Sequence, residues 1–199
     1  MSRTSVPEYR NTPLDPEQLN QPFRTLTSWH VITGSSCSGK TTLINQLAEA
    51  GFQTVPEGGR LFFERELAKG RKIDEIRADP AQFTPEIYRI MLENEADSKP
   101  DQLLFFDRAQ PDSYAFYRAS GLDPNAIIQD GYLFRYESVF MLERFPYQKD
   151  GVRTADDETA DYLERWIARD YSDLGYNLIW VPVLPREERL AFVLEKIGI

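Results

Sequence analysis

Residues 34–41 read GSSCSGKT, and this run limits the folds open to the chain more than any other part of the sequence. It fits the pattern G-x-x-x-x-G-K-[ST] in full. Gly34 and Gly39 permit backbone angles and close approaches that a Cβ atom would block. Such a loop directs successive backbone N–H groups at an anion, and the positive end of the following helix adds to that field. The run therefore predicts a strand before it, a helix after it and a phosphate-binding loop between them.

The nucleotide-binding site predicted from this motif is a run of consecutive residues: Gly34, Ser35, Ser36, Cys37, Ser38, Gly39, Lys40, Thr41 and Thr42. Lys40 is expected to reach the β- and γ-phosphates, and the Thr41 hydroxyl is expected to bind Mg²⁺. Cys37 is expected to contribute only its backbone N–H, with an activated thiol at a helix start as the alternative. The sequence lacks N-K-x-D, the guanine-reading motif of GTPases, so ATP is the favoured nucleotide.

Short apolar segments alternate with helical patterns from Trp29 onward. The expected strands are residues 29–33, 52–55, 102–106, 138–142 and 176–181. Between them apolar residues recur at helical spacing, and Thr84-Pro85 is expected to begin one helix with Thr84 as its cap. This alternation predicts an α/β fold, a parallel five-stranded sheet with helices on both faces. Ligands of such sheets bind outside the carboxyl ends of the strands.

The first part of the chain differs in composition from the rest. Residues 1–27 are rich in proline, polar and charged residues and show no apolar periodicity. They are predicted to form an extended or mobile arm, followed by a P-loop kinase or ATPase domain over residues 28–199. The alternatives for the arm are a disordered tail and a segment that packs on the body through Tyr9, Leu14 or Phe23.

Two carboxylates follow the second and third expected strands. Glu57 can accept the proton of an acceptor hydroxyl or hold that hydroxyl in line with the terminal phosphate, the alternative being a helix-start acid. Asp107 ends an apolar run in the Walker B form, in which the acid binds the metal directly or through water. With Arg108 it can also grip a substrate, and an ion-paired loop is the alternative. Asp112 is expected to cap the next helix.

Composition excludes several classes of function. The formal net charge is −9, so DNA or RNA would be repelled overall. The single cysteine leaves no internal disulfide and no cysteine-based metal site. Because His30 is the one histidine, neither a histidine-based metal site nor a Ser-His triad is expected. His30 is expected to be a packed side chain. No segment has the length of a membrane span or of a signal-peptide apolar core, so a cytoplasmic protein is expected.

The resemblance to a known family rests on three segments: VITGSSCSGKTTLINQLAEAGFQTVPEGGR (31–60), FFDRAQPDSYAFYRASG (105–121) and YSDLGYNLIWVPVLPREERLAFVL (171–194). In this order they resemble small P-loop ATPases and kinases related to the ribosylnicotinamide kinase domain of bacterial NAD metabolism. The placement of the acid after the second strand and of Asp107-Arg108 is also similar to that in deoxynucleoside kinases. The resemblance implies a nucleoside-kinase-like fold with sheet order 2-3-1-4-5.

The same resemblance implies an arginine-bearing lid after the fourth strand, which closes over the phosphates and excludes water. Arg153 is the candidate, with Lys149 and Arg144 behind it, and a solvated charged loop is the alternative. It further implies that the loop 181–189 lies beside the base of the nucleotide. The acceptor site is expected among aromatic residues of the other loops and helices: Phe62, Phe63, Phe83, Tyr88, Tyr114, Phe116, Tyr117 and Tyr132.

The favoured reaction is transfer of the γ-phosphate of ATP to a hydroxyl of a small, nucleoside-like metabolite. Its expected catalytic residues are Lys40, Glu57, Asp107, Arg108 and Arg153, and its expected Mg²⁺ ligands are Thr41 and Asp107. The alternatives are an NTPase or switch that acts with a protein partner, with water as the acceptor, and a non-catalytic nucleotide sensor. The acceptor and the oligomeric state stay open, although a homodimer is common among such kinases.

Overall fold

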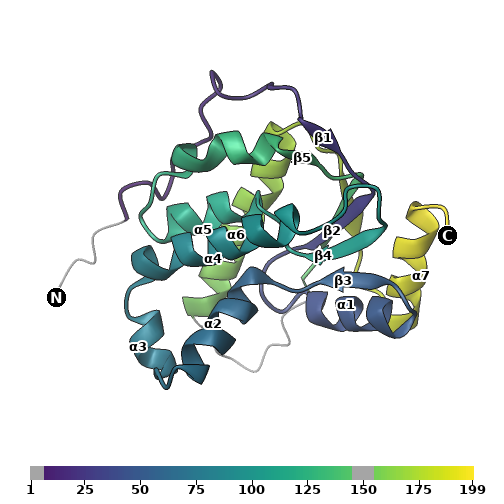
Figure 1. The fold of residues 1–199 in the computed structure, drawn as a ribbon, viewed down its shortest axis with the longest axis horizontal. Coiled ribbons are helices and arrows are strands. Elements are labelled where there is room, and N and C mark those ends of the chain that lie inside the picture. The colour runs from purple at the N-terminus through teal and green to yellow at the C-terminus, as the bar shows by residue number, and fades with distance from the viewer. Residues whose placement is uncertain (1–6, 145–154) are drawn as a thin grey trace.

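The centre of the fold is a parallel sheet with the strand order β3-β4-β2-β6-β7. A computed structural model describes residues 7–144 and 155–199, with the side chains of 155 and 156 outside that description (Figure 1). The five strands are β2 (Trp29–Thr33), β3 (Gln53–Val55), β4 (Leu104–Asp107), β6 (Ser138–Leu142) and β7 (Leu178–Val181). Numbered by their place among these five, they confirm the predicted order 2-3-1-4-5.

Helices cover both faces of this sheet (Figure 1). The helices are α1 (Lys40–Glu49), α2 (Gly58–Ala68), α3 (Ile73–Arg77), α4 (Pro80–Ala96), α5 (Asp112–Ala119), the 3₁₀ helix η1 (Pro124–Tyr132), α6 (Ala155–Asp173) and α7 (Arg186–Lys196). A short parallel pair, β1 (Thr25–Leu26) and β5 (Phe134–Arg135), completes the described elements. No helix within residues 7–144 and 155–199 has both the length and the apolarity that crossing a membrane requires.

The largely apolar sequences of the central strands β2, β4 and β6 follow from this double cover. All five residues of β2 are buried, and successive side chains point to opposite faces of the sheet. Ile32 packs in one cluster with Leu43 of α1, whereas Val31 belongs to a second cluster with Tyr114 of α5 and Leu163 of α6. A strand with two buried faces does not alternate between polar and apolar residues. Such strands can therefore be recognised in the sequence as short, mostly apolar segments.

Residues 7–27 form turns and the short strand β1, and part of this segment packs on the body. Leu14 is 2% exposed and belongs to the larger core cluster. Arg118 of α5 is fully buried, forms a two-pronged ion pair with Asp170 of α6 and donates from Nε to the backbone oxygen of Thr12. One buried cation therefore fixes this segment to two helices. The division of the chain into an arm and a domain at residue 27 stays a prediction.

The start of α4 differs from the expectation at Thr84-Pro85. The helix begins at Pro80, and the Asp79 carboxylate caps it by accepting the N–H of Gln82 at 3.2 Å. Proline at the first helical position and an acidic cap are a strong start signal. Thr84 is inside the helix, where its Oγ1 pairs with Ser120 Oγ of the next helix at 2.8 Å. The predicted cap was therefore wrong by one helical turn.

Glu95, near the end of α4, connects this helix to the loop that follows β4. It is 2% exposed, and its Oε1 accepts the N–H of Gln110 at 3.0 Å and the hydroxyl of Tyr136 at 2.7 Å. Burial raises the pKa of Glu95 to about 7, against the opposing effect of these two hydrogen bonds. Glu95 thereby holds the loop after Asp107 and Arg108 in place.

The raised pKa of Glu95 predicts a pH-dependent stability. Between the ordinary pKa of 4.5 and about 7 the unfolded chain releases this proton and the folded chain keeps it, so stability falls as the pH rises. Glu95→Gln cannot ionise but keeps an oxygen acceptor. The free energy of unfolding of Glu95→Gln, minus that of the unmodified protein, should therefore increase with pH. The expected increase between about pH 5 and about pH 8 is up to about 3 kcal/mol.

Urea unfolding at both pH values measures this difference. The control is Glu93→Gln, which removes a half-exposed carboxylate of the same helix. A relative stability of Glu95→Gln that is the same at both pH values would contradict the buried, protonated state of Glu95.

Candidate functional site

The phosphate-loop residues 34–39 connect the end of β2 to the start of α1. Gly34 and Gly39 have φ angles of 139° and 87°, and Cys37 also has a positive φ of 60°. A Cβ atom on Gly34 would lie 2.9 Å from the backbone oxygen of Leu142 and 3.0 Å from Ser38 Oγ. Gly39 caps α1 without a side-chain hydrogen bond, so the first N–H groups of the helix stay available to an anion.

Lys40 lies with its ammonium group inside the loop. The side chain is buried, and Nζ donates to the backbone oxygen of Ser35 at 2.7 Å. Burial, and then the charge of Arg108, lower the pKa of Lys40 to about 8, while Glu57 and Asp107 act in the opposite direction. Lys40 is still mainly charged at neutral pH, and a phosphate near Nζ would stabilise the ammonium group and raise its pKa again.

Two side chains from distant parts of the chain hold the loop from outside. Ser35 Oγ donates to Glu164 Oε2 of α6 at 3.1 Å, and Arg189 Nη1 of α7 donates to the backbone oxygen of Ser38 at 2.8 Å. Sequence reasoning missed both contacts. Glu164 is one of many charged residues in a helical pattern, and such a pattern does not tell which of them turns toward another element.

Arg108 is held between two carboxylates at the carboxyl ends of β3 and β4. Its Nε donates to Glu57 Oε1 at 3.0 Å and its Nη1 to Asp112 Oδ1 at 2.8 Å. The residue has a φ of 66°, in the left-handed region that non-glycine residues rarely adopt. Burial acts to lower the pKa of Arg108, but the neighbouring carboxylates Asp112 and Glu57 hold it above its ordinary value. The structure thus brings Glu57 and Arg108 together, as neighbours of the phosphate loop.

Asp112 does more than begin α5. Its carboxylate is fully buried and accepts from Thr33 Oγ1, from Arg108, from the N–H of Ala109 and from the Tyr171 hydroxyl at 2.8 Å. Thr33 ends β2, and Tyr171 lies on α6. Every oxygen of Asp112 is therefore used within the protein, and its role is to fix Arg108 beside the loop.

Asp107 has a different environment from Asp112. It is 5% exposed, and its Oδ1 has no hydrogen-bond partner among the residues that the structure describes. Burial, followed by the negative charge of Glu57, raises its pKa to about 6. Thr41, at the start of α1, is exposed. A buried, unpaired carboxylate oxygen beside a free helix start fits a hard cation such as Mg²⁺, which favours one or two protein oxygens plus phosphates and water.

Metal clusters of another kind are absent from the described part of the chain, where no three His, Cys, Asp or Glu side chains lie close enough to hold an ion together. His30 is buried, and its Nδ1 lies 2.7 Å from Ser138 Oγ, so it is the packed side chain that was expected. Burial lowers the pKa of His30. Cys37 is an exposed free thiol in the phosphate loop.

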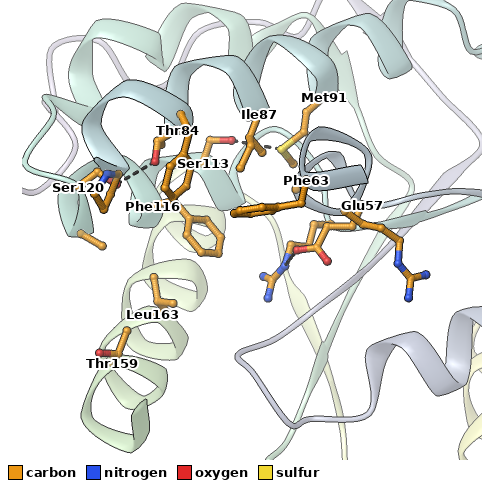
Figure 2. A pocket seen from close by; sticks show the side chains of 16 residues that line it. Glu57, Phe63, Thr84, Ile87, Met91, Ser113, Phe116, Ser120, Thr159 and Leu163 are labelled. Atoms are coloured by element: carbon orange, nitrogen blue, oxygen red, sulfur yellow. Dashed lines mark hydrogen bonds and ion pairs between the residues drawn. The ribbon is translucent and has the colours of Figure 1, made fainter. Parts of the chain in front are cut away.

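A cavity of about 520 Å³ opens next to Glu57 and Arg108. Figure 2 shows Glu57 at one end and Thr84 with Ser120 at the other, with Phe63 and Phe116 between them. The walls come from α2, α4, α5 and α6 and comprise Glu57, Gly59, Arg60, Phe63, Pro80, Phe83, Thr84, Ile87, Met91, Arg108, Ser113, Phe116, Ala119, Ser120, Thr159 and Leu163. Of the aromatic residues expected to build an acceptor site, Phe63, Phe83 and Phe116 line this cavity.

A smaller hollow of about 80 Å³ adjoins the end of the phosphate loop at Gly39. It is formed by the start of α1 and the segment after β7: Gly39, Thr42, Leu43, Gln46, Leu184, Arg186 and Arg189. The segment 181–189 was expected beside the base of a nucleotide. The two spaces, one large and one small, share no lining residue.

Arg153 and Lys149, two of the three residues expected in a lid, lie outside the described residues. Arg144, the third, forms ion pairs with Asp157 and Asp161 of α6, at 3.1 Å to Asp157. Its guanidinium is thus tied to the helix that follows. The lid stays a prediction.

The comparisons with known proteins agree on the fold. The profile of the AAA domain family matches residues 29–189. A NadR protein in complex with NR has 18% sequence identity and a TM-score of 0.62, covering 87% of this chain and 52% of NadR. The thymidylate kinase of Ehrlichia chaffeensis has 14% identity and a TM-score of 0.62, covering 87% of this chain and 100% of the kinase. The deoxyadenosine kinase of M. mycoides with bound dATP has 14% identity and a TM-score of 0.53, covering 86% and 100%.

These likenesses confirm the suspected relation to the P-loop nucleoside and nucleotide kinases and the predicted fold class. At such low identity they bear on the fold alone. The chain spans about half the length of the NadR protein that it resembles. A comparison with curated proteins finds no significant match.

The geometry of Gly34 predicts a specific loss on substitution. In Gly34→Ala the new methyl group would press on Leu142 and Ser38, in addition to the strain of a positive φ. Nucleotide affinity should fall at least about tenfold, because the loop must move to relieve the contact. The control is Gly51→Ala, whose φ is also positive, at 92°, but whose Cβ would meet nothing within 4 Å.

Calorimetric titration with ATP separates the two variants. Gly51→Ala should lower the melting temperature slightly and keep its affinity for ATP. Equal ATP affinities for Gly34→Ala and Gly51→Ala would contradict the phosphate-binding role of this turn.

Proposed function

The chain belongs to the AAA domain family, and on that premise we propose that it is a kinase that transfers the terminal phosphate of ATP to a hydroxyl group of a small molecule. One observation carries this proposal: a cavity of about 520 Å³ adjoins Glu57 and Arg108, whose charges act on Lys40 of the phosphate loop. A site that activates only water has no need of such a space. The cavity lies within the usual size range of small-molecule sites, about 300–1,000 Å³.

The phosphate loop would hold the nucleotide in this proposal. Residues 34–42 supply backbone N–H groups. Lys40 supplies a buried ammonium group, which a nearby phosphate would stabilise. Thr41 and Asp107 would hold Mg²⁺, which when bound offsets the charge of the β- and γ-phosphates. The small hollow at Leu184 would accept the base. The proposed preference for ATP over GTP is inferred from the sequence alone.

Glu57 would orient the acceptor. One of its oxygens accepts from Arg108 Nε, and the other makes no hydrogen bond among the described residues. This second carboxylate oxygen is available to accept a hydrogen bond from the acceptor hydroxyl. It can take the proton of that hydroxyl while the hydroxyl oxygen attacks the γ-phosphorus. The new bond joins the acceptor oxygen to the γ-phosphorus, the bond from that phosphorus to the β,γ-bridging oxygen breaks, and ADP leaves. Arg108 would offset charge on the transferred group, as would Arg153 from the proposed lid.

An NTPase or switch that acts with a protein partner is the second candidate, with water as the acceptor. ATP turnover with Mg²⁺ separates the two, measured with and without a panel of small alcohols and nucleosides that includes nicotinamide riboside. We expect ADP release that depends on one acceptor, together with a gain of one phosphate in the mass of that acceptor. Steady ADP release that ignores the panel would contradict the kinase. Homodimer formation and a cytoplasmic location stay predictions.

The proposed role of Glu57 predicts a selective loss of turnover. Glu57→Gln keeps the shape of the side chain but cannot accept a proton, so kcat should fall by about 10²–10⁴-fold while ATP affinity changes little. Arg108 keeps Asp112 as its partner in this variant, so the fold should survive. The control is Glu64→Gln, which removes a carboxylate of the same charge from an exposed site on α2. An unchanged kcat in Glu57→Gln would contradict the proposed role of Glu57 as proton acceptor.

A further inference from the structure

The walls of the large cavity specify the chemistry of the acceptor. Resting on the proposed kinase function, we propose that the acceptor is an alcohol with an apolar body, of which 3-phenyl-1-propanol is a simple representative, and that nucleosides are poor substrates. This acceptor differs from the nucleoside-like acceptor that the family resemblance implies. The argument depends on which polar groups the cavity offers, and where.

Aromatic and aliphatic side chains form most of the cavity wall. Phe63, Phe83 and Phe116 are partly exposed, and their rings face a space that no described residue fills. The centroids of Phe63 and Phe83 lie 5.6 Å apart in an edge-to-face arrangement. Ile87 and Met91 of α4 add aliphatic surface on the same wall (Figure 2). Exposed apolar surface of this kind is stabilised when an apolar ligand covers it.

Three of the hydroxyl side chains that line the cavity already have partners. Thr84 Oγ1 and Ser120 Oγ share a hydrogen bond of 2.8 Å, and Ser113 Oγ lies 3.5 Å from the sulfur of Met91. Among the described lining residues there is no asparagine, glutamine or histidine. Away from its charged end, the wall therefore offers hydroxyl groups but no side-chain amide, the neutral group that can pair with a donor and an acceptor on the edge of a nucleobase at the same time.

Charged groups are confined to one end of the cavity. Glu57 precedes α2, Arg60 lies in its first turn, and Arg108 follows β4. Figure 2 shows Glu57 at the end opposite Thr84 and Ser120. A ligand with one hydroxyl and an apolar body can place the hydroxyl at Glu57 and cover the aromatic wall with the rest. A nucleoside in the same pose would bury the polar edge of its base against apolar side chains.

The cost of that burial sets the expected selectivity. Each donor or acceptor that loses water without gaining a partner weakens binding by roughly 5- to 150-fold. A nucleobase carries several such groups, and a phenyl ring carries none. Selectivity of at least about tenfold for the apolar alcohol is therefore expected, and it arises from rejection of the base as much as from attraction of the ring.

The test measures phosphorylation of 3-phenyl-1-propanol, thymidine and adenosine by the whole chain with ATP and Mg²⁺, and calorimetric binding of the same three compounds. The expected result is a kcat/KM for the phenylalkanol at least about tenfold above that of either nucleoside. A preference for a nucleoside would overturn this inference and leave the kinase proposal standing. Binding of the phenylalkanol with no phosphorylation would support the apolar ligand class and count against the kinase. No binding of the phenylalkanol would overturn the inference.

Met91→Gln tests the wall directly. Glutamine has nearly the shape of methionine but adds an amide to the cavity, so nucleoside affinity should rise and phenylalkanol affinity should fall, each several-fold. Ile87→Gln, one helical turn away and only half-buried, is the second variant in case Met91→Gln does not fold. The control is Leu67→Gln, which changes an exposed leucine of α2 outside the cavity. Selectivity that stays unchanged in both cavity variants would contradict the proposal.

Discussion

The site depends on an ion-pair network in which Arg108 bridges the carboxylates of Asp112 and Glu57. Asp112 is fully buried and is held by Thr33 and Tyr171 as well as by the guanidinium. Removing one member of a buried ion pair costs about 3–5 kcal/mol, because the other charge is left without compensation. The arrangement therefore has one stable geometry, and it joins the end of β2, the end of β4, α6 and the start of α2. This ion-pair network fixes the position of Glu57 at the edge of the cavity, near the phosphate loop.

Most of the fold could be predicted from the sequence because the physics involved is local. Strands buried on both faces must be continuous apolar runs, and the loop after β2 carries a motif whose glycines have the positive φ angles it requires. The error at the start of α4 is also local. Asp79 and Pro80 form a stronger start signal than Thr84-Pro85, and the apolar pattern alone did not distinguish them. The β4 strand includes Asp107, so the carboxylate ends the strand and does not follow it.

The site could be predicted only in part, because several of its members gain their role from tertiary contacts. Glu57 and Arg108 follow strands, and that position is visible in the sequence. Asp112 was expected to be a helix cap, and its partners come from residues up to 79 positions away. Glu164 and Met91 lie within ordinary helical patterns, which do not show the face that meets the phosphate loop or the cavity. The chemistry of an acceptor site is set by such faces.

The fate of the terminal phosphate tests the central claim most directly. ATP labelled at the γ-phosphate is incubated with the protein, Mg²⁺ and an acceptor that stimulates turnover, and the label is followed into the acceptor and into inorganic phosphate. The account predicts that nearly all label released from ATP appears on the acceptor, because in the proposed mechanism Glu57, paired with Arg108, directs the acceptor hydroxyl at the γ-phosphate. Label that appears as inorganic phosphate in step with ADP, with or without the acceptor, would contradict it.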